Sequence, residues 1–203
     1  MPARRLVLAS TSRYRRELLE RLRLPFDVVA PGVEETTLDG ETPSATALRL
    51  ALAKADAVAA RHVEAVVVGS DQIADLDGRG LGKPGDHARA TAQLAAMRGR
   101  TVVFQTAVAV VCRAIGFRVA ELVPVAVRFR DLSDAEIERY LRAETPYDCA
   151  GSAKIETLGI ALVAGVDCDD PTALIGLPLI RTCALLRRAG VDPLASADLE
   201  PPQ

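Results

Sequence analysis

The segment from Leu6 to Leu19 constrains the fold of this chain more than any other part of the sequence. Four apolar residues, Leu6 to Ala9, predict a short buried strand, followed by three hydroxyl residues and a helical pattern that starts at Arg13. A helix that begins directly after such a turn presents free backbone N–H groups and the positive end of its dipole, which together bind anions. Arginines in a first helical turn cost roughly 0.3 to 1 kcal/mol each, because the dipole prefers carboxylates there. We therefore expect this turn to bind a polyanion.

Composition excludes several classes of protein. The 203 residues, 49% of them hydrophobic, suffice for one large domain or two small lobes with a compact core. With 25 Lys and Arg against 27 Asp and Glu, the net charge of −2 argues against a surface that binds nucleic acid throughout, so anion recognition must be local. The four cysteines are at least fifteen positions apart, which favours structural thiols in a reducing cytosol over a zinc site. No cleavable apolar leader and no run of 18 apolar residues are found, which predicts a soluble cytoplasmic protein.

Strand and helix patterns alternate through the first half of the chain, as is typical of an α/β fold whose sheet is covered by helices. Two long β-rich runs then predict an extended hairpin, and Ser133 with Glu136 predicts a capping box before a later helix. The expected strands are 6–9, 26–30, 65–70, 101–112 and 118–129, and the expected helices are 13–22, 43–61, 86–97, 133–143 and 178–190. The sequence has neither an internal repeat nor a linker long enough to divide it, and residues 192–203 have no periodicity.

Acidic residues that could bind a metal or accept a proton occur at two places. Asp71 follows the apolar run Ala65 to Val68, and ligands of α/β proteins gather at the carboxyl ends of strands. The alternative is that Asp71 caps a turn. Glu34 and Glu35 are adjacent in the loop after the second strand, where they either share a compensating cation or are solvated surface charges.

Two lysines have unusual settings. Lys54 lies among small apolar residues of a predicted helix, so it either pairs with a carboxylate or ligand, or extends its ammonium to the edge of that face. Lys83 lies on a glycine-rich bend and is either a phosphate ligand or a solvated turn residue. The bend is not a P-loop, because Asp77 occupies the first glycine position and Pro84 follows the lysine.

Short motifs along the chain, taken in order, resemble the Maf family of nucleoside triphosphate pyrophosphatases from about Leu6 to Leu194. Each motif alone is weak, and their common order is what is specific. The motifs are Leu8-Ala-Ser-Thr-Ser-x-x-Arg-Arg16, Glu34-Glu-Thr36, Ala51-x-x-Lys54-Ala, Gly69-Ser-Asp71, Gly82-Lys83-Pro84, Phe129-Arg130, Ala150-Gly-Ser152 and Gly176-Leu-Pro-Leu179. The resemblance implies a mixed twisted sheet with flanking helices in two lobes around a deep cleft. It implies a single domain over residues 1–194, an irregular tail over 195–203, and a homodimer.

The resemblance also implies an activity: hydrolysis of a nucleoside triphosphate between its α and β phosphates, with a divalent metal, Mg²⁺ or Mn²⁺. The chain is most similar to the subgroup that acts on 7-methyl-GTP, because Tyr14, Gln72 and Glu156 occupy that subgroup's three specificity positions. The subgroup prefers tryptophan at the first of these, and most relatives carry proline where this chain has Arg13. A tyrosine can stack on the cationic methylated base with a gain of roughly 0.5 to 2 kcal/mol. A carboxylate at 156 can accept both N–H groups of the guanine Watson–Crick edge.

Residue roles follow from the resemblance together with the chemistry of each side chain. Asp71 is assigned as the proton acceptor, with Lys54 and Lys83 as further catalytic residues. Glu35 and Asp71 are assigned as metal ligands, and the roles of the two carboxylates can be exchanged. The residues assigned to the substrate phosphates are Ser10, Ser12, Arg15 and Lys83.

Two rival interpretations remain at this point. One is a Maf-type enzyme that hydrolyses dTTP and UTP. The other is a nucleotide-sensing regulator of cell division without turnover. The arginines between positions 13 and 23 form a solvated helix face in the simplest interpretation, so no stable nucleic-acid partner and no membrane partner are expected.

Overall fold

The computed structural model describes residues 4–195, and within them seven strands form one mixed sheet in the order β2-β1-β3-β5-β6-β7, with β4 paired to β3. The strands are β1 Leu6–Ala9, β2 Phe26–Val28, β3 Val66–Leu76, β4 Arg79–Leu81, β5 Thr101–Cys112, β6 Phe117–Phe129 and β7 Val163–Asp167. The helices are α1 Arg13–Glu20, α2 Pro43–Ala59, α3 His87–Met97, α4 Asp134–Glu144 and α5 Leu179–Arg188. The predicted α/β class, a mixed sheet with flanking helices, is confirmed.

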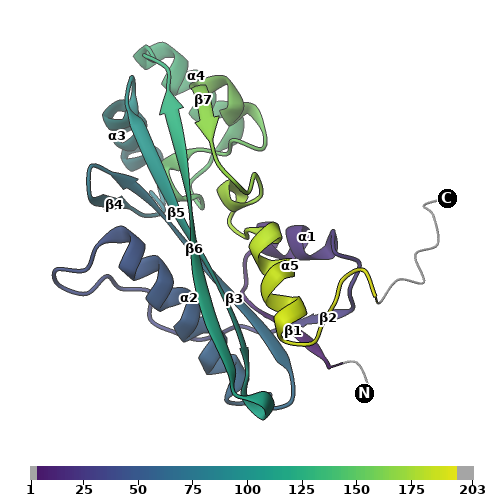
Figure 1. Ribbon diagram of the computed structural model, residues 1–203. Coiled ribbons are helices and arrows are strands. Elements are labelled where there is room, and N and C mark those ends of the chain that lie inside the picture. Colours follow the sequence, from purple (N-terminus) through teal and green to yellow (C-terminus); the bar gives the residue numbers. More distant parts are fainter. Residues whose placement is uncertain (1–3, 196–203) are drawn as a thin grey trace.

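Helices cover both faces of the sheet, with α2 on one side and α1 and α5 on the other (Figure 1). The period-2 alternation of β1 explains how both faces become apolar: Leu6 and Leu8 pack with α1 and α5, whereas Val7 and Ala9 pack under α2. A third core cluster lies around α3 and α4 at the other end of the long strands. The sheet therefore has two packed faces along β1 and β3. The division into two lobes stays a prediction.

The alanine-rich α2 lies unusually close to β3. Ala47, Ala51 and Ala55 are fully buried at a spacing of four, so the helix presents a smooth stripe to the sheet. A Cβ built on Gly69 would lie 2.4 Å from the Ala51 carbonyl oxygen and 2.8 Å from the Ala55 backbone nitrogen. Only glycine fits this contact, and the close approach places the α2 residue Lys54 over β3.

The structure corrects the predicted end of the third strand. Asp71 was expected to follow a strand over 65–70, but β3 continues to Leu76 because β5 goes on pairing with it, with Asp71 opposite Ala107. The parallel partner β1 ends where Ala9 pairs with Gly69. Asp71 is thus inside a strand, directly beyond the carboxyl end of the neighbouring strand.

Other predicted elements are confirmed or extended. The long hairpin forms as β5 and β6, and Ser133 and Glu136 make the predicted capping box of α4. Part of the glycine-rich bend is the short strand β4, which Asp77 and Gly78 join to β3 through a turn with positive φ at both residues. The strand β7 was not predicted, and it pairs antiparallel with β6. Residues 196–203, most of the predicted tail, lie outside the described residues.

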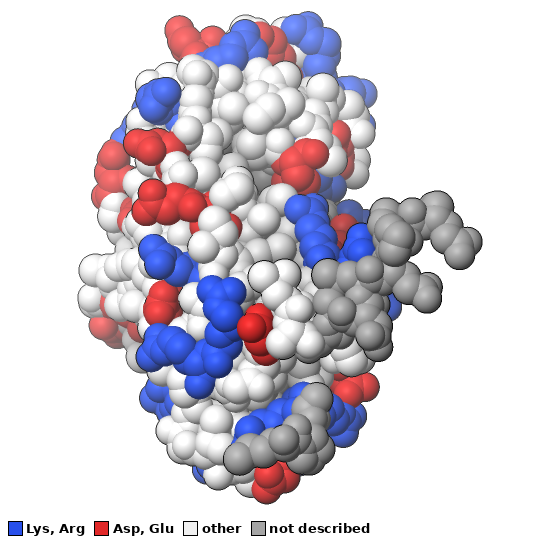
Figure 2. Space-filling view, turned by 45° about the vertical axis from the view of Figure 1, so that its right-hand side comes forward, with Lys and Arg blue, Asp and Glu red and all other residues white. Residues whose placement is uncertain are grey.

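Surface charge and cysteine chemistry agree with the composition. Figure 2 shows basic and acidic side chains interspersed in small groups over one face of the molecule. All four cysteines are free thiols, and Cys112 is buried. Within residues 4–195, no helix is both long enough and apolar enough to cross a membrane.

Candidate active site

One cavity of about 590 Å³ brings together every residue that the sequence assigned to the site. The walls come from the β1–α1 turn, the loop before α2, α2 itself, β3, the β4 hairpin and two segments near 150 and 175. The predicted residues that line it are Ser10, Ser12, Tyr14, Arg15, Glu35, Lys54, Asp71, Gln72, Lys83 and Glu156. Segments separated by more than a hundred positions therefore meet at one place.

The β1–α1 turn forms one wall, as the anion-binding prediction requires. Ser12 caps α1, its Oγ accepting from the Arg15 backbone N–H at 3.4 Å, and the Ser10 Oγ accepts from the Ser12 N–H at 3.1 Å. Arg15 is held from its other end, because its Nε donates to the Gly176 carbonyl at 2.9 Å. Burial lowers the pKa of the Arg15 guanidinium, while Asp71 and Glu35 act in the opposite direction. Arg15 is thus a fixed cation between the turn and the carboxylates, whereas Arg16 pairs with Glu20 on the exposed face.

Lys54 is the centre of the cavity's charge network. Its Nζ lies 2.7 Å from Asp71 Oδ1 and 2.6 Å from Glu35 Oε1, and its side chain is only 4% exposed. Of the two interpretations of Lys54, the one in which it pairs with a carboxylate is therefore correct, and its ammonium does not extend to the edge of the helix face. Burial by itself would raise the pKa of the Glu35 carboxyl, but the hydrogen bond and attraction from Lys54 outweigh it and the pKa is lowered.

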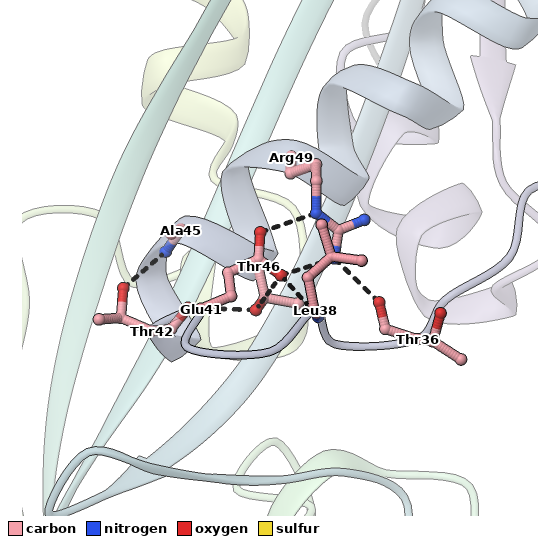
Figure 3. Close-up of polar contacts among 7 residues, drawn as sticks. All are labelled: Thr36, Leu38, Glu41, Thr42, Ala45, Thr46 and Arg49. Atoms are coloured by element: carbon pink, nitrogen blue, oxygen red, sulfur yellow. Dashed lines mark hydrogen bonds and ion pairs between the residues drawn. The ribbon is translucent and has the colours of Figure 1, made fainter.

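The loop that carries Glu35 is tied to α2 by a second polar network (Figure 3). Arg49 donates two hydrogen bonds of 2.7 Å to the Glu41 carboxylate, one from Nε and one from Nη2. Its Nη2 also donates to the Thr36 carbonyl at 2.9 Å. Thr46 Oγ1 and the Leu38 backbone N–H donate to the same Glu41 carboxylate. Hydrogen bonds from Arg49 hold the pKa of Glu41 at about 2. The residue after Glu35 is therefore anchored to the helix that carries Lys54.

Lys83 is exposed on the β4 hairpin and lines the cavity. Its charge acts on the site, since it is one of the cations that lower the pKa of Glu35. No carboxylate of the described residues lies within ion-pair distance of its Nζ. Its ammonium is thus available to an anion in the cavity.

The residues at the centre fit a divalent metal only in company with a phosphate ligand. Within residues 4–195, no group of three or more His, Cys, Asp or Glu is arranged to hold an ion. Glu35 and Asp71 each give Lys54 one oxygen, and the second oxygen of each accepts no hydrogen bond from the described residues. Mg²⁺ typically takes one or two carboxylates and completes its six ligands with substrate phosphates and water.

Gln72 is engaged with the wall of the cavity. Its Nε2 lies 2.9 Å from Thr106 Oγ1, 2.9 Å from the Ala173 carbonyl and 3.1 Å from the Leu174 carbonyl. Ser70 Oγ contributes a further bond of 2.7 Å to the Gly176 carbonyl. Together these side chains fix the 173–176 segment, whose last residue opens the motif Gly176-Leu-Pro-Leu179.

Tyr14 and Glu156 line the part of the cavity that adjoins a second, smaller cavity, which both residues also line; this part is called the base end below. The Arg13 guanidinium carbon is 4.7 Å from the Tyr14 ring centroid, and Arg13 Nη2 donates to the Tyr14 hydroxyl at 2.8 Å. Burial raises the pKa of Tyr14 to about 12, with the Arg13 hydrogen bond acting against it. Burial also raises the pKa of Glu156, which Lys154 opposes and Glu144 reinforces.

Sequence reasoning missed three contributors to the site. The Gly176 carbonyl has no sequence signature, because every residue carries a backbone oxygen. Arg49 is one of many arginines, and nothing in its spacing distinguishes it. Lys154 could have been found, because lysine is rare in this chain and the other two lysines were already assigned to the site.

The fold and the cavity define an α/β protein in which a strand–turn–helix unit faces a buried lysine and two carboxylates across one cavity. Residues 5–189 match the family described as Maf-like protein. The chain therefore belongs to the Maf family, as the sequence motifs predict.

Relatives of high identity cover almost the whole chain. A protein of Albidiferax ferrireducens is 65% identical over 193 residues, which are 95% of this chain and 97% of the relative. A protein of Polaromonas sp. is 67% identical over 189 residues, 93% of this chain and 86% of the relative. One of Burkholderia thailandensis is 60% identical over 201 residues, 96% and 94% of the two chains. All three relatives are named 7-methyl-GTP pyrophosphatase.

Proposed function

We propose that this protein hydrolyses 7-methyl-GTP to 7-methyl-GMP and pyrophosphate. The observation that carries the proposal is Lys54 Nζ held between Asp71 and Glu35, in one cavity with the β1–α1 turn and with Tyr14 and Glu156. The names of the relatives support the same reaction and substrate. Such an enzyme would remove methylated nucleotides from the nucleotide pool.

In the proposed binding mode the triphosphate lies over Ser10 and Ser12, where the α1 dipole and backbone N–H groups favour negative charge. Arg15, already oriented by Gly176, offers its remaining guanidinium nitrogens to phosphate oxygens as a planar fork. Lys83, two residues after β4, adds a point charge from another wall of the cavity. These groups neutralise the substrate before any bond changes.

In the proposed chemical step, one water molecule adds across the α–β anhydride bond, so that the monophosphate and pyrophosphate separate. Asp71 accepts the proton of the attacking water, a role typically worth 10² to 10⁴ in rate. Lys54 holds Asp71 and Glu35 in place through bonds of 2.7 and 2.6 Å. A divalent ion held by Glu35 and Asp71 together with substrate phosphates would supply charge stabilisation at the reacting phosphates.

Base selection is proposed for the far end of the cavity. Tyr14 would stack on the cationic base and Glu156 would accept its N–H groups. Gln72 would act through the 173–176 segment that it fixes, since its amide nitrogen is engaged there. A homodimer stays a prediction from the family resemblance, and a cytoplasmic location stays a prediction from composition. Sedimentation of the purified chain would test the dimer.

The test is pyrophosphate release by the full chain with Mg²⁺, comparing 7-methyl-GTP, GTP, ITP, dTTP and UTP. We expect the highest kcat/KM for 7-methyl-GTP. Asp71→Asn should abolish release while nucleotide binding stays measurable. Asp75→Asn is the matched control, because Asp75 is on the same strand but holds the β3–β4 turn and Gln105 instead of Lys54.

The other outcomes would overturn the proposal in distinct ways. Turnover confined to dTTP and UTP would assign the chain to the pyrimidine-specific type. Tight binding without turnover of any nucleotide would favour a sensor. Full activity of Asp71→Asn would remove Asp71 from the mechanism.

A further inference from the structure

The three lysines of this chain are placed differently from its arginines. Among 25 Lys and Arg residues, only Lys54, Lys83 and Lys154 are lysines. The first two line the cavity that contains Asp71, and the third lines an adjoining cavity of about 290 Å³. Lysine presents a compact point charge, whereas arginine presents a planar fork. Each of the three lysines therefore lines one of these two cavities, in a chain whose other basic residues are arginines.

The second cavity adjoins the base end of the first. Both are lined by Arg13, Tyr14, Glu156 and Ile175. Its remaining walls come from α1, the end of α4 and the segment around Lys154. A ligand whose phosphates lie on the β1–α1 turn would reach this cavity with its base.

Lys154 is buried, yet its ammonium has spare hydrogen-bonding capacity. The residue is 8% exposed, and its Nζ makes one hydrogen bond, of 3.2 Å, to the Glu144 carbonyl at the end of α4. The Glu144 carboxylate is engaged elsewhere, by the Leu158 N–H and the Thr157 hydroxyl. An ammonium carries three donors, so two remain without an acceptor among the described residues. Buried donors left unmatched are costly, which points to an acceptor supplied by a ligand.

Glu156 lies two residues further on and lines the same cavity. Its carboxylate forms no ion pair with Lys154 or with any other side chain of the described residues, although Lys154 is close enough to lower its pKa. The Lys154 ammonium, which can only donate, and the Glu156 carboxylate, which can only accept, thus lie near each other without pairing. Together they are complementary to the edge of a planar base that has a carbonyl next to N–H groups.

We propose that Lys154 is a specificity-determining residue that donates a hydrogen bond to the O6 carbonyl of a guanine base while Glu156 accepts from N1–H and N2–H. This inference rests on the proposed function and extends it to the second cavity as the base subsite. Lys154 and Glu156 then recognise the guanine edge by hydrogen bonds, and Tyr14 recognises the positive charge of the 7-methylated base by stacking. A base with an amino group at position 6 is rejected, because its N–H would face the Lys154 donors.

The test compares GTP with 6-thio-GTP, which replaces O6 by a weaker acceptor and keeps N1–H and N2–H. Wild-type protein should prefer GTP, and Lys154→Met should lower kcat/KM for GTP and 7-methyl-GTP roughly 10- to 100-fold, the worth of a hydrogen bond from a charged donor. In Lys154→Met the preference for GTP over 6-thio-GTP should disappear. Its preference for GTP over ITP, which lacks the 2-amino group, should persist, whereas Glu156→Gln should lose it.

Two controls separate recognition from charge and from folding. Arg21→Gln removes a positive charge from the wall of the same cavity and should keep the preference for GTP over 6-thio-GTP. Lys154→Arg should recover part of the activity, and thermal unfolding shows whether each variant folds. If Lys154→Met does not fold, the wild-type ratio decides, since equal kcat/KM for GTP and 6-thio-GTP overturns the proposal.

An equal loss on GTP and 6-thio-GTP in a folded Lys154→Met protein would also overturn it, because Lys154 would then only stabilise the end of α4. Failure of the proposed function has a different signature. In that case the wild-type protein itself would release no pyrophosphate from GTP, ITP or 7-methyl-GTP.

Discussion

The two ends of the main cavity differ in how far the protein satisfies its own polar groups. At the carboxylate end, Lys54 and Asp71 are nearly inaccessible and bonded to each other, and Lys54 also holds Glu35. At the base end, the Glu156 carboxylate forms no ion pair with the described residues, and Lys154, in the adjoining smaller cavity, donates one hydrogen bond to the Glu144 carbonyl. The first end is preorganised by the fold, whereas the second leaves capacity for a ligand. Substitutions should therefore cost stability at one end and selectivity at the other.

The largest effect is expected for Lys54→Met. Removing the ammonium leaves Asp71 buried without its counter-charge, which typically costs about 3 to 5 kcal/mol in the free energy of unfolding. Urea denaturation would measure the loss, and pyrophosphate release should fall for every nucleotide alike. Asp56→Asn is the control on the same helix, because its exposed pair with Arg118 is worth less than about 1 kcal/mol. A Lys54→Met protein as stable as wild type would show that the two ends do not differ in this way.

Gly69→Ala should come next, at about 1 to 3 kcal/mol of overpacking. The new Cβ would meet backbone atoms of Ala51 and Ala55, which cannot move without shifting α2 away from β3. Gly82→Ala is the comparison, since a Cβ there meets nothing within 4 Å. Thermal unfolding of both variants measures the difference, and equal midpoints would contradict the close contact.

Tyr14→Leu should change selectivity with little effect on stability. Loss of the ring removes a cation–π contribution of roughly 0.5 to 2 kcal/mol, so the preference for 7-methyl-GTP over GTP should fall roughly 2- to 30-fold. Tyr14→Phe keeps an aromatic face and should keep most of the preference. The ratio of kcat/KM for the two nucleotides is the measurement, and an unchanged ratio in Tyr14→Leu would exclude stacking there.

The smallest effect concerns pH. Burial raises the pKa of Glu156 above its ordinary value; Glu144 and Asp148 act in the same direction, and Lys154 in the opposite one. Glu156 accepts hydrogen bonds from both N–H groups only when it is ionised. As the pH is lowered from neutrality, Glu156 becomes protonated at a higher pH than an ordinary glutamate does. The ratio of kcat/KM for 7-methyl-GTP to that for UTP should therefore decrease toward acid pH.

Glu156→Gln is the control for this titration. It should lower turnover of 7-methyl-GTP more than that of UTP at neutral pH, and its ratio should no longer depend on pH through residue 156. An equal loss on both nucleotides would remove Glu156 from base selection.

Local patterns predicted the strand–turn–helix unit and the long hairpin, because each carries its own periodicity or cap. The residues of the cavity were identified through the family resemblance, since local patterns alone left the roles of Glu35, Lys54 and Lys83 open. Local patterns could not place Asp71 inside β3, since the run after it becomes a strand only through pairing with β5. They also could not show that Lys54 would reach two carboxylates, because that depends on the approach of α2 allowed by Gly69. Contacts between segments distant in the sequence thus determined the end of β3 and the position of Lys54, which local secondary-structure propensity did not.

The Gly176 carbonyl has a consequence for the time at which the main cavity can form. It accepts from Arg15, which is 161 positions earlier in the chain, and from Ser70. At usual synthesis rates, roughly 10 to 30 seconds separate the emergence of Arg15 and of Gly176 from the ribosome. A nascent chain therefore lacks the contact that orients Arg15 during most of its synthesis. A ligand of this cavity can stabilise the folded chain only once nearly the whole polypeptide has been made.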